Sequence, residues 1–308
     1  MPLLGMLLGG IGLLYLGAEW LVRGASTIAL RLGVTPLVVG LTVVAFATSA
    51  PELLVSLLAA LTEQQAISVG NVIGSNIFNL VILGIAALVR PLQITARTVR
   101  AEMPIAFLVS LGFWGLGWDG RIGRGDAVIL LVCFLGFLWH CLKTARTEEV
   151  AMEGERGSPH PWLIATMGLG GLGLGAHLFV RGAVQVSRLL GVSELVIGLT
   201  VVAVGTSLPE LVTSLIAAYR KVDDISVGNI VGSNIFNILL IVGGCALIRP
   251  LPVPPAVLRI DVPMMLATML LAFPLMWSGL RLNRWEGIAL IVAYAGYVFY
   301  LYQVGGSP

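Results

Sequence analysis

Long apolar runs separated by short polar segments dominate the chain. The charge-poor runs cover residues 2–22, 35–61, 66–89, 101–118, 126–143, 161–180, 195–219, 225–248, 262–279 and 286–303. A transmembrane helix needs about 20 mostly apolar residues, so runs of this length are typical of membrane spans. The pattern predicts an all-α polytopic membrane protein with ten transmembrane helices, five on each side of the charged segment 143–160.

One segment occurs twice. Residues 40–79 recur without a gap as 198–237, 158 positions later, with 26 of 40 residues identical. The residues shared by both copies include Thr42/Thr200, Thr48/Thr206, Ser49/Ser207, Pro51/Pro209, Glu52/Glu210, Asn71/Asn229, Ser75/Ser233 and Asn79/Asn237. Each half is one five-helix unit, and because five is odd the second copy must enter the membrane from the opposite side. We therefore expect two inverted repeats, a common transporter architecture.

These repeats define the predicted organisation. The first five-helix repeat is 1–142, the linker is 143–160 and the second repeat is 161–308. With the N-terminus outside, twelve Lys and Arg residues fall on the inner side and six on the outer side. Positive residues favour the cytoplasmic side, so both termini are expected outside and the linker in the cytoplasm.

Composition changes the picture only by excluding other classes. Hydrophobic residues make up 57% of the chain and charged residues 11%, and the mean hydropathy is +0.97. The expected partner is therefore the lipid bilayer, with no obligatory protein partner. A net charge of +2 without a basic patch argues against nucleic acid binding.

No cofactor motif is present, and we expect no enzyme. An intramembrane hydrolase would need a nucleophile with a base, and Ser49 and Ser207 have neither His nor Lys nearby in their spans.

Glu52 and Glu210 are the only ionisable residues within the second and seventh spans. A carboxylate at mid-membrane costs several kcal/mol, by estimates from about 2.5 upward. No Lys or Arg lies within either span, so the partner is a proton, a bound cation, or both in turn. The structural alternative is a protonated glutamate whose only role is to hold neighbouring helices together.

A proline precedes each glutamate. Pro51 and Pro209 have no N–H to donate to the carbonyl four residues back, so each helix is expected to break beside its carboxylate. A packing kink is the alternative explanation. Asn71, Ser75 and Asn79 follow at spacings of four and share one helical face, as their counterparts do. Carboxylate, carbonyl, hydroxyl and amide oxygens favour a hard cation, Ca²⁺ before Na⁺, because transition metals prefer His or Cys ligands.

At these motifs the sequence resembles the Ca²⁺/cation antiporter superfamily, close to the prokaryotic Na⁺/Ca²⁺ exchangers. The resemblance implies exchange of Ca²⁺ for Na⁺ by alternating access, in a prokaryotic-type inner (plasma) membrane. It also implies Glu52 and Glu210 as shared Ca²⁺ and Na⁺ ligands and Thr48 and Thr206 as carbonyl ligands of Ca²⁺. The remaining implied residues are Ala45, Ser49 and Ser75 at one Na⁺ site, Ala203, Ser207 and Ser233 at the other, and Asn79 and Asn237 facing the centre.

Two residues depart from the pattern of that superfamily. Ala47 stands where the first repeat usually has Gly, which leaves the carbonyl available. Asn237 stands where well-studied exchangers carry Asp, so one anionic group is missing. Two carboxylates neutralise one Ca²⁺, whereas three Na⁺ on the same pair leave a charge of +1, and protons are an alternative counter-ion. An H⁺/Ca²⁺ antiporter and a cation channel are therefore the competing functions. The Gly-rich spans that begin near 2 and 161 are the expected sliding elements.

Overall fold

The structure is a computed structural model that describes residues 3–62, 65–145, 159–190 and 203–305. The first half contains α1 (Leu3–Leu32), α2 (Pro36–Val39), η1 (Gly40–Val44), α3 (Ala45–Thr48), α4 (Ala50–Leu61), α5 (Gln65–Val89), β1 (Leu92–Gln93), η2 (Thr98–Glu102), α6 (Met103–Leu116), η3 (Gly117–Asp119), β2 (Arg121–Ile122) and α7 (Arg124–Thr144). The second half contains α8 (Pro161–Leu189), α10 (Ala203–Thr206), α11 (Leu208–Tyr219), α12 (Asp223–Phe236), η5 (Asn237–Val242), α13 (Gly243–Ile248), β3 (Leu251–Pro252), η6 (Val257–Asp261), α14 (Val262–Trp277), η7 (Ser278–Leu280), β4 (Arg281–Leu282) and α15 (Arg284–Gly305).

The helices confirm a polytopic membrane protein. Among the described residues, seven helices are long and apolar enough to cross a membrane, and Pro36–Thr48 with Ala50–Leu61 forms an eighth span bent by 46°. The predicted span 195–219 lies partly outside the described residues, which include the short apolar helix α11 from it. The predicted span 286–303 corresponds to α15, which is not among the eight. The count of ten therefore stays a prediction.

Helices α1 and α8 are longer than predicted. The runs 2–22 and 161–180 continue as helix to Leu32 and Leu189. Arg23 therefore lies within α1, where its Nε is 2.8 Å from Oε1 of Glu19 one turn earlier. This ion pair at a spacing of four helps the helix to carry the charge beyond the apolar run.

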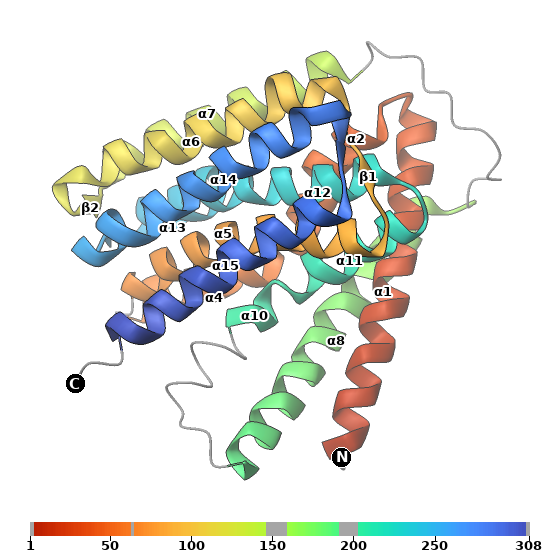
Figure 1. Cartoon of the computed structure of the whole chain (residues 1–308), viewed down its shortest axis with the longest axis horizontal. Helices are drawn as coiled ribbons and strands as arrows, with labels where there is room; N and C mark the ends of the chain where they lie inside the picture. The colour runs from red at the N-terminus through yellow and green to blue at the C-terminus, as the bar shows by residue number, and fades with distance from the viewer. Residues whose placement is uncertain (1–2, 63–64, 146–158, 191–202, 306–308) are drawn as a thin grey trace.

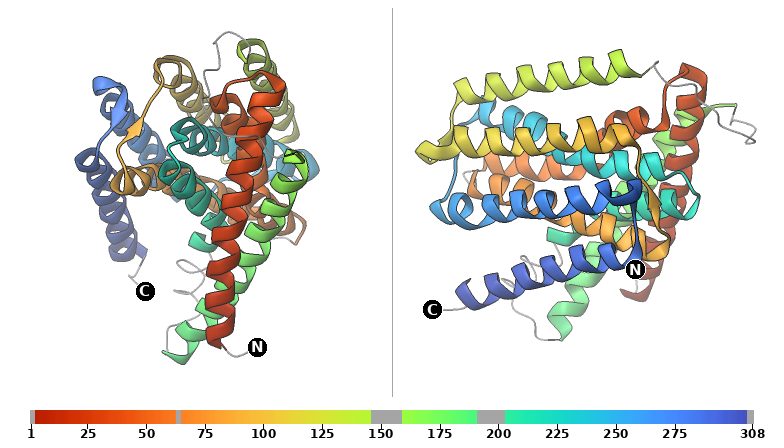
Figure 2. Two further views of the ribbon diagram at one scale, coloured as in Figure 1. Left: turned by 90° about the vertical axis from the view of Figure 1, so that its right-hand side faces the viewer. Right: turned by 45° about the horizontal axis from the view of Figure 1, so that its top comes forward.

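Close glycine contacts join α1 to α8. The two helices lie side by side and cross the direction of the other long helices (Figures 1 and 2). A Cβ placed on Gly17 would lie 2.6 Å from the backbone nitrogen of Leu172, and one on Gly168 would lie 2.5 Å from that of Leu21. Only glycine permits this backbone approach. The two helices thus form one closely packed pair.

Two short β-ribbons connect the halves. β1 pairs antiparallel with β4, with Leu92 opposite Leu282, and β2 pairs with β3, with Ile122 opposite Leu251. Each ribbon takes one strand from each half. The four apolar side chains are fully buried, so the ribbons also close the ends of the hydrophobic core.

Four short π-helical segments, η1, η2, η5 and η6, interrupt the helices. η2 and η6 lie just before Pro104 and Pro263, which remove a backbone donor from the next turn. The segment η5 has another cause. The distance along the chain from Asn79 to Arg90 is eleven residues, whereas that from Asn237 to Arg249 is twelve. A π turn absorbs one extra residue without ending the helix.

Candidate functional site

Glu52 and Glu210 occupy equivalent places in the two halves. Each lies in the first turn of a helix, α4 or α11, directly after a proline. The preceding helices α3 and α10 end one residue before Ser49 and Ser207, whose ψ angles of 4° and 9° are not helical. The predicted breaks beside the carboxylates are thus present. A helix N-terminus favours negative charge, so each break creates a favourable place for a carboxylate.

The two glutamates are linked through serines of the opposite half. Ser49 Oγ donates to Glu210 Oε1 at 3.1 Å, and Ser207 Oγ donates to Glu52 Oε1 at 2.9 Å. Each glutamate residue is only 1% exposed. These reciprocal bonds bring the two breaks together in the interior of the protein. The second serine also lies 3.3 Å from Ser75 Oγ, which adds a third predicted site residue to the cluster.

Two asparagines hold the broken helices against their neighbours. In the first half Asn71 Nδ2 donates to Ser56 Oγ at 3.0 Å and to the Glu52 carbonyl at 3.4 Å. The second half contains the equivalent bonds, from Asn229 Nδ2 to Ser214 Oγ at 3.0 Å and to the Glu210 carbonyl at 3.4 Å. Thr48 Oγ1 joins the two sets by donating to Asn229 Oδ1 at 2.9 Å. The same polar residues therefore position both carboxylates.

Asn76 and Asn234 belong to the cluster, although the sequence analysis did not include them. Asn79 Nδ2 donates to Asn234 Oδ1 at 2.9 Å, and Asn237 Nδ2 donates to Asn76 Oδ1 at 2.9 Å. Asn76 Nδ2 also donates to the Asn234 carbonyl at 3.1 Å. Their presence in both copies of the G-S-N-I-F-N segment was the signal that could have identified them. They orient the amides of Asn79 and Asn237.

Five buried oxygens at this cluster have no hydrogen-bond partner. They are Oε2 of Glu52, Oε2 of Glu210, Oδ1 of Asn79, Oδ1 of Asn237 and Oγ of Ser233. Four of the five are pure acceptors when the carboxyl groups are ionised. Buried acceptors of this kind are costly unless a cation or a proton satisfies them. The described residues contain no group of three or more His, Cys, Asp or Glu side chains suited to a metal, so neutral oxygens would have to complete any coordination shell.

The other predicted site residues lie in the same segments. Thr48 and Ala45 are fully buried in α3. Thr206 ends α10, is partly buried and lines a cavity of about 490 Å³. Ala203 begins α10. The cavity also borders Pro51, Pro209 and residues of α8 such as His177, so it lies directly beside both breaks.

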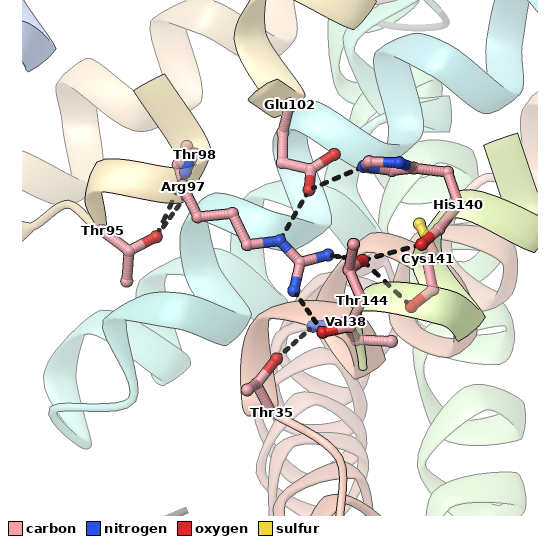
Figure 3. Close-up of polar contacts among 9 residues, drawn as sticks. All are labelled: Thr35, Val38, Thr95, Arg97, Thr98, Glu102, His140, Cys141 and Thr144. Atoms are coloured by element: carbon pink, nitrogen blue, oxygen red, sulfur yellow. Dashed lines mark hydrogen bonds and ion pairs between the residues drawn. The ribbon is translucent and has the colours of Figure 1, made fainter. Parts of the chain in front are cut away.

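Another buried acid, Glu102, provides a comparison within the molecule (Figure 3). It is 0% exposed, and its Oε1 lies 3.0 Å from Arg97 Nε and 3.8 Å from His140 Nε2. The guanidinium group of Arg97 also donates to the carbonyl and hydroxyl of Thr144 at the end of α7. The carboxylate of Glu102 thus has a cationic side chain as its partner, although its Oε2 has no hydrogen-bond partner either. Glu52 and Glu210 have serine partners instead.

Comparison with known proteins agrees with this geometry. The chain matches the family model described as sodium/calcium exchanger protein over residues 2–143 and 160–303. The inner membrane protein YrbG of Escherichia coli is 37% identical over 88% of each chain. The sodium/calcium exchanger MaX1 of Methanosarcina acetivorans is 30% identical over 97% of this chain and 98% of that protein. A solved structure of the sodium-calcium exchanger NCX_Mj superimposes with a TM-score of 0.86 at 32% identity, covering 98% of this chain and 99% of that one.

Proposed function

Because the chain belongs to the sodium/calcium exchanger protein family, we propose that it exchanges Ca²⁺ for Na⁺ across the membrane by alternating access. Its ions compete for one site between the two broken helices. Membership of this family supports a cation antiporter and points to a transporter rather than an enzyme. The identity of the counter-ion, the residues that hold the ions and the topology are parts of the proposal.

The five unpartnered oxygens carry the proposal. Ca²⁺ takes six to eight oxygen ligands at about 2.3–2.6 Å and tolerates irregular geometry. Glu52 and Glu210 supply charge, Asn79, Asn237 and Ser233 supply neutral oxygens, and the backbone carbonyls of Thr48 and Thr206 would complete the shell. Ser49, Ser75, Ser207, Ala45 and Ala203 would contribute hydroxyl and carbonyl oxygens to flanking Na⁺ sites. The ions are cargo, and no cofactor is proposed.

Competition for one carboxylate pair explains the coupling. A pair of ionised glutamates without a cation would be costly to move through the low-dielectric barrier. The carrier therefore changes its orientation only when Ca²⁺ or monovalent cations neutralise the pair. The cross-half serine bonds support this view, because both carboxylates lie within one hydrogen-bonded cluster.

Asn237 bears on the counter-ion. Its amide adds an oxygen but no charge, so Glu52 and Glu210 are the acids of the cluster. Two Na⁺ or two H⁺ would balance this pair as one Ca²⁺ does, whereas three Na⁺ would leave a charge of +1. We propose Na⁺ as the counter-ion and retain H⁺ as the second candidate on the strength of this missing acid.

The β-ribbons support the inverted ten-span topology. In that topology the segments that contain β1 and β4 both lie on the inner side, and those that contain β2 and β3 both lie on the outer side. The observed pairings, β1 with β4 and β2 with β3, join segments of the same side. When repeat 1–142 is superimposed on repeat 161–308, β1 corresponds to β3 and β2 to β4. The superposition therefore converts one ribbon into the other. The proposed linker 143–160 would then be cytoplasmic, with both termini outside the inner (plasma) membrane.

The α1–α8 pair is the proposed moving part. Close backbone contacts at Gly17 and Gly168 pack these helices tightly together, so they would move as one unit across the broken helices. The cavity supports this proposal, because it lies between α8 of this pair and Pro51 and Pro209 of the broken helices.

Purified protein in liposomes tests the proposal. An outward Na⁺ gradient should drive ⁴⁵Ca²⁺ uptake, and this uptake should persist when a protonophore collapses any pH gradient. Uptake driven by a pH gradient alone would identify the H⁺/Ca²⁺ antiporter. Ca²⁺ flux without any counter-ion would identify a channel and overturn antiport. Liposomes without protein supply the background.

A further inference from the structure

A partly buried ion pair connects α1 to the core of the second half. Glu19 lies near the middle of α1, with its side chain 10% exposed, and it accepts from Arg220 Nε at 2.7 Å and from Nη2 of the same guanidinium. Both carboxylate oxygens are thus bound by one arginine in a bidentate pair, a strong and directional arrangement. Arg23 of α1 shares the same carboxylate but is 54% exposed in its side chain.

The residue that receives Glu19 is itself fixed. Arg220 follows the end of α11, in a turn that closes at Asp223, the first residue of α12. The carboxylate of Asp223 binds Arg90 Nη2 and accepts from the backbone N–H of Gln93. Arg90 Nε also donates to the carbonyl of Ala218, at 3.2 Å. The turn is therefore anchored to the end of α5, so that Glu19 joins α1 to a fixed part of the core.

The other half has no equivalent of this ion pair. At the repeat offset of 158, Glu19 corresponds to His177 and Arg220 corresponds to Thr62. A histidine and a threonine contain no acid and cannot form an ion pair. The surroundings differ in the same way, since α1 packs against α11, whereas the cavity of about 490 Å³ is lined by His177 of α8 and by Leu54 and Val55 of α4.

We propose that the Glu19–Arg220 pair is a one-sided latch that stabilises the state in which α1 is docked on α11. In inverted repeats, the opposite state docks α8 on α4 and moves the cavity to the side of α1. The latch must break for that transition, and no ion pair forms between His177 and Thr62 to replace it. The two access states of the carrier are therefore unequal in energy. This inference rests on the proposed alternating access and concerns its regulation.

Disulfide formation between positions 177 and 62, the counterparts of Glu19 and Arg220, tests the latch. His177→Cys with Thr62→Cys, in a chain whose three native cysteines are replaced by serine, forms a disulfide only when α8 docks on α4. A protease site inserted between Ala145 and Pro159 allows the linked halves to be distinguished on a denaturing gel. In liposomes, Glu19→Gln or Arg220→Gln should raise the rate of disulfide formation about tenfold, because each removes a charge-assisted bidentate pair. The charge swap Glu19→Arg with Arg220→Glu should restore the original rate.

Arg23→Gln is the matched control, because it removes a guanidinium from the same carboxylate without untying α1 from α11. Its rate should stay within about twofold of the starting protein, as expected for an exposed pair within one helix. Equal rates in Arg220→Gln and the starting protein, or an equal rise in Arg23→Gln, would overturn the latch. Thermal unfolding in detergent identifies any variant that fails to fold. In that case the charge swap decides whether the ion pair sets the rate of disulfide formation.

The readout separates the latch from the transport assignment, since it requires no Ca²⁺. Altered disulfide formation without Na⁺-driven ⁴⁵Ca²⁺ uptake would leave the latch standing and refute the proposed counter-ion. Normal uptake with unaltered disulfide formation would refute the latch and leave the proposed counter-ion standing.

Discussion

The two halves of the protein are alike at the centre and unlike at the periphery. Around the carboxylates, the bonds of Ser49, Asn71 and Asn79 recur in the second half with equivalent partners. Away from the carboxylates, Glu19 forms an ion pair in the first half, whereas the corresponding position in the second half is not an acid. In the proposed mechanism the shared interactions serve the ion, which meets equivalent surroundings from both sides. The interactions present in only one half can set the relative free energies of the two access states.

The largest expected effect comes from the carboxylates. Glu52→Gln and Glu210→Gln should each reduce Na⁺-driven ⁴⁵Ca²⁺ uptake at least about 100-fold, because either change leaves a single charge to balance a divalent ion. The losses should be equal, since the two positions are equivalent. Asp119→Asn, at a side chain that is 60% exposed, should keep full activity. Near-normal flux in either glutamine variant would refute a shared site.

The glycine contacts come next. Gly17→Ala and Gly175→Ala would each place a Cβ within 2.7 Å of a backbone atom of the other helix. Each should cost about 1–3 kcal/mol of stability by overpacking, measured as a lower unfolding temperature in detergent. Gly170→Ala lies on the same helix as Gly175 with nothing within 4 Å and should be neutral or slightly stabilising. A destabilised Gly170→Ala variant together with a normal Gly17→Ala variant would contradict the packing described.

A smaller effect is expected from the serines that bridge the halves. Ser49→Ala and Ser207→Ala each remove a hydrogen bond to a carboxylate, typically worth about 1.5–3 kcal/mol. The apparent affinity for Ca²⁺ in the flux assay should fall about tenfold in both variants, and their double variant should be less than additive because the two bonds belong to one cluster. Ser110→Ala, another buried serine, which bonds within its own helix and to Met269, should leave this affinity unchanged.

The smallest effect on rate, and the sharpest on coupling, should come from an added acid. Asn237→Asp places a third carboxylate where the unpartnered amide oxygen of Asn237 lies, and Asn79→Asp does the same in the other half. With two acids and two Na⁺ the exchange is electroneutral, so the original protein should be insensitive to a K⁺–valinomycin potential. Either variant should bind one more monovalent cation and become sensitive to the potential. Potential-sensitive exchange by the original protein would contradict the two-charge balance.

The centre of the molecule could be predicted from the sequence because repetition marks it. Glu52 and Glu210, each after a proline, predicted both the helix breaks and their burial, and the structure confirms these features. The positions of Asn76 and Asn234 were missed, although they too are repeated. A spacing of four residues selects Asn71, Ser75 and Asn79 on one helical face. The amide groups that bond to Asn79 and to its counterpart lie on the opposing helix, so this spacing does not reveal them.

The periphery could not be predicted in the same way. The Glu19–Arg220 contact joins residues 201 positions apart, and neither residue is shared by the two copies of the repeat. The ribbons of two-residue strands have no periodicity of their own to detect. The π turn at Asn237 was present in the sequence only as one extra residue before Arg249, which becomes visible when the two halves are aligned beyond the repeated motif.

The exchange of strands between the halves bears on the origin of this architecture. Because each ribbon combines β1 or β2 with a strand of the other half, an isolated half would expose two unpaired edges and leave its glutamate without the bridging serine. In the proposed inverted topology, such a half becomes complete only beside a copy inserted in the opposite orientation. An ancestral protein of half this length would therefore have needed dual insertion and dimerisation before a linker made the arrangement permanent.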